Sequence, residues 1–150
     1  MFTAEFEYDP NDPGGYRCGM ANVGRAAGGE ELAVKLFELP PGESLCPYHY
    51  EYVEEWLLVL DGAVAVRVPD GEEALARGEI VRFPAGSAGG HKVINRGGAP
   101  ARVLMFSSGR EPSVAVYPDS DKIGVWPGDP ADTVMLKRAD GHMDYWEGER

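Results

Sequence analysis

The feature that most limits the fold is a run of short apolar segments between residues 32 and 108, each ended by glycine, proline or aspartate. Segments of about four to eight residues, rich in Val, Leu and Phe and bounded in this way, are typical of β-strands. No window of twelve or more residues keeps a helical apolar period free of Gly and Pro, so we expect very little helix. The predicted strands are 32–39, 54–60, 63–68, 72–75, 80–83, 91–95 and 102–107.

Short strands joined by tight turns indicate a barrel or a sandwich. Asp61-Gly62 separates two of the segments and predicts a two-residue hairpin turn, because such turns need a positive φ. A chain of 150 residues is long enough to bury a core as one domain. We therefore expect a single all-β domain, residues 1–150, with a barrel at about 32–108 and arms at 1–31 and 109–150. The second arm is predicted to add edge strands near 114–117, 123–126 and 133–136.

The charge of the chain excludes some classes of partner. A formal net charge of −11 repels nucleic-acid phosphates and anionic membrane surfaces, so we expect neither as a partner. The first residues lack the basic and apolar regions of a secretory signal, and no apolar run is long enough to span a membrane. Two cysteines are too few for a disulfide framework, and a cytoplasmic location is expected.

Four side chains of metal-binding type occur at spacings that predict one site. His49, Glu51 and Glu55 have the same parity, and because a strand alternates its side chains, they are expected on one face, with Glu54 on the other. His91 comes from a second predicted strand. Two imidazoles and two carboxylates balance a divalent cation and leave two octahedral positions for water, substrate or dioxygen. The expected cofactor is a divalent transition metal: Mn, Fe, Zn or Ni.

Ordinary structural roles compete with this interpretation. Buried histidines that hydrogen-bond to their neighbours are common, and Glu51 and Glu55 are also consistent with surface positions on a shifted strand. Two inward carboxylates without a cation would repel each other and raise one pKa, which favours a bound metal.

Two stretches resemble the motifs of the cupin superfamily. His49-x-Glu51, three residues, Glu55, six residues and Gly62 resemble the first motif, in which a second His stands at the place of Glu51. The second motif is matched, with two extra residues before its histidine, by Gly78, Pro84, Gly86, His91 and Asn95. The chain is thus similar to small single-domain cupins.

The resemblance implies a double-stranded β-helix, or jelly-roll, barrel with its site in the mouth, and a homodimer that pairs edge strands. It implies a metal bound by His49, Glu51, Glu55 and His91, with Glu51 or Glu55 as a catalytic base. The expected function is isomerisation, epimerisation or dioxygenation of a small polar metabolite; the alternatives are a non-enzymatic protein that binds a small molecule or metal, and a metal-free structural cupin. Substrate contacts are expected from Tyr48, Tyr50, Trp56, Phe83 and Met105.

Overall fold

The computed structural model of the protein describes residues 5–149. The regular secondary structure in this part of the chain is almost entirely strand, with one short helix, α1 (Val23–Ala26). Three 3₁₀ turns occur at Ser87–Gly89, Pro118–Ser120 and Pro130–Asp132. The predicted all-β fold with very little helix is confirmed.

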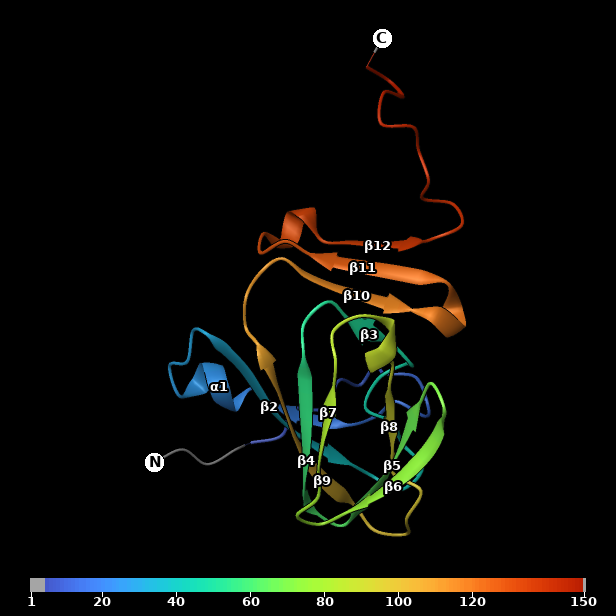
Figure 1. Ribbon diagram of the computed structural model, residues 1–150. Coiled ribbons are helices and arrows are strands. Elements are labelled where there is room, and N and C mark those ends of the chain that lie inside the picture. Colours follow the sequence, from blue (N-terminus) through green and yellow to red (C-terminus); the bar gives the residue numbers. More distant parts are fainter. Residues whose placement is uncertain (1–4, 150) are drawn as a thin grey trace.

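Three antiparallel sheets make up the molecule (Figure 1). One wall of the barrel is a five-stranded sheet in the order β1 (Gly19–Ala21), β2 (Leu32–Leu39), β9 (Ala101–Ser108), β4 (Glu55–Asp61) and β7 (Ile80–Phe83). A second sheet has the order β6 (Gly71–Ala76), β5 (Ala63–Val68) and β8 (Lys92–Ile94). The third lies across one end of the barrel in the order β12 (Val134–Lys137), β11 (Lys122–Trp126), β10 (Ser113–Tyr117) and β3 (Tyr50–Glu51).

The hydrophobic core lies between the first two sheets. Alternate residues of β2, β4, β5 and β9 point inward, as the period of two along a strand requires. Leu57, Val103, Val93 and Leu39 have no exposed surface. They belong to one continuous apolar core together with Phe37, Phe83 and Met105.

A turn lies at Asp61-Gly62 as the sequence predicted, but it does not close a hairpin: β4 pairs with β7 and β9, whereas β5 pairs with β6 and β8 in another sheet. β4 ends at Asp61 and β5 starts at Ala63, and Gly62 between them has φ +72°. A Cβ atom on Gly62 would lie 3.1 Å from the Ala101 Cα, so the site excludes a side chain by space as well as by backbone conformation.

The strands follow the predicted segments, and the bounds differ at most by a residue or two at each end. Two short strands, β1 and β3, were not predicted, because two or three residues carry too little periodicity to recognise. The stretch 1–31, expected to be an irregular arm, contributes β1 and α1 to the described structure.

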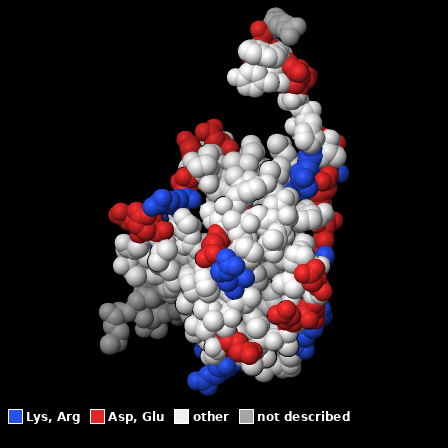
Figure 2. Space-filling model, viewed as in Figure 1, with Lys and Arg blue, Asp and Glu red and all other residues white. Residues whose placement is uncertain are grey.

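No helix among the described residues is long and apolar enough to cross a membrane. The face drawn in Figure 2 shows basic side chains scattered among acidic ones, which is the mixed surface expected of a chain with 14 basic and 25 acidic residues.

Candidate metal centre

Two histidines project from neighbouring strands into the open end of the barrel. His49 precedes β3 and His91 precedes β8, and the two form an antiparallel bridge. The backbone N–H of His49 donates to the His91 carbonyl at 3.1 Å, and the reverse bond is 2.8 Å. Because directly opposed residues project to the same side, the ring centroids are 4.6 Å apart.

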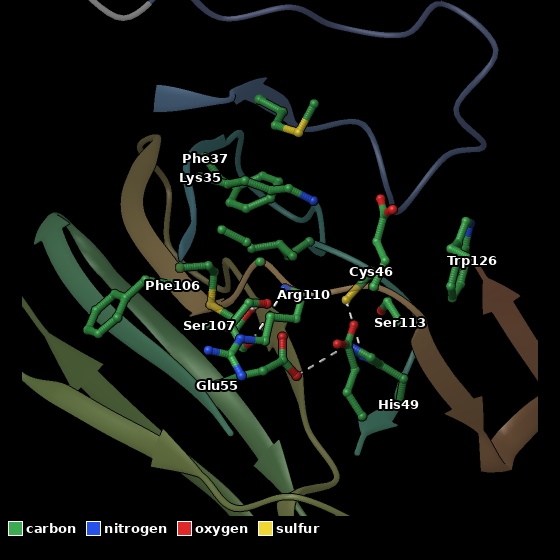
Figure 3. Close-up of a pocket in the computed structure, with 18 of the residues that line it drawn as sticks. Lys35, Phe37, Cys46, His49, Glu55, Phe106, Ser107, Arg110, Ser113 and Trp126 are labelled. Carbon is green, nitrogen blue, oxygen red and sulfur yellow. Dashed lines mark hydrogen bonds and ion pairs between the residues drawn. The ribbon is translucent and has the colours of Figure 1, made fainter. Parts of the chain in front are cut away.

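Glu55 completes a group of three ligand-type residues. It is the first residue of β4, in the five-stranded sheet, and its Oε2 lies 3.9 Å from Nε2 of His49 and 3.9 Å from Nε2 of His91. Figure 3 shows Glu55 and His49 directed toward each other within the cavity. One ligand atom from each of the three residues lies within 4.8 Å of the others, which places three donors around a single point.

Backbone carbonyls determine which nitrogen of each histidine ring carries the proton. Nδ1 of His49 lies 3.1 Å from the Pro47 carbonyl, and Nδ1 of His91 lies 2.9 Å from the Gly89 carbonyl. A carbonyl only accepts hydrogen bonds, so both Nδ1 atoms carry the proton and both Nε2 atoms keep a free lone pair. In metal sites, the ring nitrogen that does not bind the metal commonly donates a hydrogen bond of this kind, which orients the histidine.

The Nε2 atom of His91 is the strongest indication of a bound cation. It is fully buried and has no hydrogen-bond partner among the described residues. Phe83 stacks on the His91 ring at 3.7 Å between centroids, so the ring is held in place and its free lone pair is directed at Glu55. A buried unpaired nitrogen is costly, and a metal ion at the shared point of the three donors would satisfy it.

Burial shifts the pKa values of the group toward the uncharged forms. It lowers the pKa of His91 to about 4, with a contribution from neighbouring His49, and it lowers the pKa of His49 as well. Burial raises the pKa of Glu55 to about 8, and the nearby Glu51 carboxylate raises it further. Neutral imidazoles are the form that binds metals, and a cation would restore the charge of Glu55.

Glu51 lies in the same cavity but outside the group of three. It belongs to β3 in the third sheet, opposite Ala115 of β10, whereas Glu55 begins β4 in the first sheet. The chain crosses between sheets at residues 52–54, so the two carboxylates do not share one strand as the parity argument assumed. Burial raises the pKa of Glu51, while the charge of Lys35 and a hydrogen bond with Ser113 lower it.

A cavity of about 530 Å³ opens beside the three donors. Its walls are mainly apolar, with polar side chains at the end that holds Glu55 and His49 (Figure 3). The residues that line the cavity include Lys35, Phe37, His49, Glu51, Glu55, Met105, Ser113, Tyr117 and Trp126.

Lys35 is a cavity residue that sequence reasoning missed. It lies on β2 with the same parity as Phe37 and Leu39, which are buried, and therefore points toward the barrel interior. It forms none of the ion pairs found among residues 5–149. The signal for it was a lysine that shares the parity of the core-facing residues on a mainly apolar strand.

Of the residues predicted to contact substrate, Met105 lines the cavity. Phe83 is not a lining residue and stacks on the His91 ring. Tyr48 lies under the guanidinium of Arg67, at 4.1 Å from ring centroid to Cζ, and Tyr50 packs edge-on against Tyr52. These two tyrosines are not among the cavity-lining residues.

Trp56 also lies outside the cavity. Its indole N–H donates to Glu54 at 2.8 Å, and its ring stacks on Phe106. Glu54 in turn pairs with Arg82 on the outer face of β4, so within this strand Glu55 points inward and Glu54 outward. The alternation predicted from the sequence holds for this pair.

The family comparison agrees with this geometry. The model of the cupin domain family matches residues 35–107, from the middle of β2 to the end of β9. Residues 35–107 thus match a cupin domain, and His49, Glu55 and His91 all lie within this stretch.

Similar proteins include enzymes of different kinds. The chain is 35% identical over 68 residues to the tetracenomycin polyketide synthase protein TcmJ of Streptomyces glaucescens. That match covers 45% of this chain and 44% of the relative, so the chain spans less than half of the relative's length.

Two solved structures resemble the whole chain. A sugar phosphate isomerase from a cupin superfamily, from Silicibacter pomeroyi, is 25% identical, with a TM-score of 0.81 over 95% of this chain and 94% of that one. A putative sugar phosphate isomerase from Acidithiobacillus ferrooxidans is 22% identical, with a TM-score of 0.81 over 95% and 90%, which shows a shared fold.

Proposed function

We propose that this protein is a divalent-metal-dependent isomerase that interconverts small aldose and ketose phosphates, in which a proton moves from the carbon beside the carbonyl to the carbonyl carbon and the neighbouring hydroxyl proton moves to the carbonyl oxygen. The observation that carries the proposal is the group of His49, His91 and Glu55, with an unpaired Nε2 on His91, beside a cavity that holds a further carboxylate. The likeness to a sugar phosphate isomerase over 95% of the chain supports this reaction class.

His49, His91 and Glu55 would hold the metal, since their donor atoms converge and both imidazoles are neutral. A bound divalent ion supplies Lewis acidity, which makes the hydrogens beside a coordinated carbonyl easier to remove. Phe83 and the Gly89 carbonyl keep the His91 ring in one orientation, so the donors are arranged before the substrate arrives.

Glu51 is the proposed general base. It faces the same cavity from the other sheet, outside the group that holds the metal, and is free to take a proton from a substrate carbon and return it to the neighbouring one. Burial raises its pKa toward the range useful for proton transfer near neutrality. Ser113 lines the same cavity, and its hydroxyl stabilises the charged form of the Glu51 carboxyl.

Lys35 is the proposed contact for the phosphate. Its ammonium group enters the cavity from β2 and has no ion-pair partner in the described part of the chain. A free cation at the cavity favours an anionic substrate by direct Coulomb attraction. The same cavity then provides a site for oxygen atoms at one end and a site for a phosphate at the other.

Hydrogen–deuterium exchange tests the proposal. Protein shown by elemental analysis to hold one metal per chain is incubated in D₂O with aldose and ketose phosphates, and NMR follows exchange at the carbons beside the carbonyl. We expect exchange together with isomerisation, lost in Glu51→Gln and kept in Glu54→Gln. Absence of exchange across the panel would overturn the proposal, and substrate-dependent oxygen uptake would redirect it to the oxygenase alternative.

A second function is favoured by the apolar cavity wall and by the likeness to TcmJ. Ring closure of a polyketide also begins with loss of a proton beside a carbonyl, so the same metal group and the same Glu51 would serve it. The two functions differ in their dependence on Lys35. A polyketide substrate without phosphate would react equally well with the Lys35→Met variant, whereas a sugar phosphate would lose binding.

A further inference from the structure

On the inner face of the first sheet, Ser107 lies in one row with the candidate ligand Glu55. The register places Glu55 opposite Ser107 across β4 and β9, and Ser107 opposite Ala33 across β9 and β2. Directly opposed residues of antiparallel strands project to the same side of a sheet, and all three residues line the cavity. Lys35 follows Ala33 by two residues and therefore projects to the same side. The row thus leads from the metal-ligand group to Ala33 and Lys35 on β2.

Arg110 lies at the mouth of the cavity, beside the start of β2. It is a lining residue, yet its side chain is 80% exposed. The N–H of Gly109 donates to the Glu31 carbonyl at 2.9 Å, and a Cβ atom on Gly109 would lie 3.1 Å from the Ala33 backbone nitrogen. The loop after β9 is therefore packed against the start of β2. Since Arg110 pairs with Glu31 and Lys35 follows Ala33, the two cations flank Ala33 along the strand.

The ion pair that Arg110 forms with Glu31 is loose and exposed. Nε and Nη2 of Arg110 share the single oxygen Oε2 of Glu31, at 3.4 and 3.2 Å. In the Arg96–Glu72 pair, by contrast, each donor has its own oxygen, at 2.7 and 2.6 Å. The Glu31 side chain is 77% exposed and is not among the residues that line the cavity. Because exposed pairs of this kind add little stability, Arg110 can exchange Glu31 for another anion at little cost.

The space between Lys35 and Arg110 has the properties of a phosphate site. Ala33, between them, has a small side chain and leaves room for a ligand. The Ser107 hydroxyl makes only a long contact of 3.4 Å with the Ser108 carbonyl, so its proton is available to a stronger acceptor. Figure 3 shows Lys35, Ser107 and Arg110 among the side chains around the cavity. An ammonium, a hydroxyl and a guanidinium therefore face one part of it.

Lys35 connects this part of the cavity with the metal-ligand group. Its charge lowers the pKa of both Glu51 and Glu55, so the ammonium is near enough to act on both carboxylates. The third acidic lining residue, Glu111, has its carboxylate against the loop between β11 and β12. With a divalent cation at Glu55 the charges of the two inner carboxylates are balanced, and Lys35 and Arg110 then favour an anionic ligand.

We propose that Lys35, Ser107 and Arg110 form a phosphate subsite, in which Arg110 leaves Glu31 and binds the phosphate monoester of the substrate. The inference rests on the proposed function and deepens it, because it assigns two further residues to phosphate recognition and makes Glu31 a competitor for one of them. The guanidinium fork binds two phosphate oxygens at once, which an ammonium group does not. Return of Arg110 to Glu31 opens the subsite again and releases the ligand.

Binding of glycerol phosphate to the full chain, measured by calorimetry with glycerol as the phosphate-free probe, tests the subsite. Arg110→Met is expected to weaken glycerol phosphate binding about tenfold, the size of one charge-assisted hydrogen bond. Arg110→Lys is expected to weaken it less, because lysine keeps the charge but not the fork. Glu31→Gln removes the competitor and is expected to strengthen binding by about two- to threefold. Glycerol is expected to bind equally to all of these variants.

The Arg82–Glu54 pair supplies matched controls, because it lies on the outer face of the first sheet and carries the same charges. Arg82→Met and Glu54→Gln change the net charge by the same amounts as the test variants and are expected to leave binding unchanged. All four side chains are exposed, so the variants are expected to fold. The double variant Glu31→Gln with Arg110→Met is expected to bind as weakly as Arg110→Met alone, since Glu31 acts through Arg110.

Equal binding in Arg110→Met and Arg82→Met would overturn the proposal and would indicate that the phosphate binds at the metal instead. Glu31→Gln that binds no more tightly than Glu54→Gln would also overturn it. So would a double variant that binds more tightly than Arg110→Met, because Glu31 would then act by its charge alone. These measurements need no turnover. Absence of deuterium exchange would overturn the isomerase and leave the binding results unchanged, and loss of the subsite would likewise leave the exchange result unchanged.

Discussion

At the scale of single residues, the neutral state of His91 and the inward position of Glu55 define the site. Both follow from contacts of the His91 ring. The Gly89 carbonyl accepts a hydrogen bond from Nδ1, the Phe83 ring stacks on the imidazole, and Nε2 faces the Glu55 carboxylate. These contacts separate the roles of three glutamates that are close in sequence, Glu51, Glu54 and Glu55.

Glu55→Gln is predicted to lower metal occupancy at least about tenfold, because an amide is a weaker ligand than a carboxylate and removes a charge from the site. Elemental analysis after dialysis measures it. Glu54→Gln, in which the changed side chain pairs with Arg82 on the outer face, is the matched control and keeps its metal. Equal metal content in both variants would contradict the assignment of Glu55 as a ligand.

Glu51→Gln is predicted to retain metal and to slow proton transfer by about 10²–10⁴-fold, the usual effect of removing a general base. The pair of measurements is metal content and deuterium exchange on the same sample. Loss of metal in step with Glu55→Gln would instead make Glu51 a fourth ligand, as the sequence predicted.

The pH dependence of stability of the metal-free protein follows from two opposed shifts. The pKa of Glu55 is about 8 in the fold against 4.5 in the unfolded chain, so the native state holds an extra proton and stability falls as pH rises from 4.5 to 8. The pKa of His91 is about 4 against 6.5, so stability rises as pH rises from 4 to 6.5. Above pH 6.5 His91 is neutral in both the folded and the unfolded chain, so only the fall in stability caused by Glu55 remains.

Metal-free protein is therefore predicted to lose about 2 kcal/mol of unfolding free energy between pH 6.5 and 8, at about 1.4 kcal/mol per unit. Urea unfolding at the two pH values in the presence of a chelator measures it. The loss is expected to disappear in Glu55→Gln, which does not titrate. A wild-type protein equally stable at both pH values would contradict the burial-driven shift.

At the scale of elements, the turn between β4 and β5 carries the chain from the first sheet to the second. Gly62→Ala is predicted to destabilise the fold by about 1–2 kcal/mol, because alanine resists φ +72° and its Cβ would press on Ala101. Thermal or urea unfolding measures the change. Gly98→Ala is the control, since nothing lies within 4 Å of a Cβ there and its φ is not positive. Similar values for the two variants would contradict this reason.

The lengths of the strands and the points where the chain changes sheets explain which predictions from the sequence held. Strands of four or more residues carry enough alternation to be recognised, and those from 32–39 to 80–83 lie where their periodicity placed them. The parity argument could not carry across residues 52–54, because a change of sheet resets which side a residue faces. It therefore held for Glu54 and Glu55, on one stretch, whereas Glu51 lines the same cavity from a different sheet.

At the scale of the whole molecule, metal binding and folding are linked, because two ligands come from one wall of the barrel and the third from the other. A metal at about 100 times its dissociation constant is predicted to add roughly 2.7 kcal/mol to the unfolding free energy. Calorimetry with metal and with chelator measures this. His91→Asn is expected to abolish the difference, and a full metal effect in that variant would place the cation elsewhere.

The sequence by itself determined the all-β class, most strand positions and a turn at Gly62 with positive φ, and it pointed to the candidate ligands His49, Glu55 and His91, because these depend on local periodicity and on motif spacing. Only the tertiary structure decided that Glu51 faces the cavity from a different sheet, that Lys35 joins it, and that Trp56 and Tyr48 turn away. Those outcomes depend on which strands pair and where the chain changes sheets. Pairing is set by contacts between residues far apart in the chain, which local periodicity does not record.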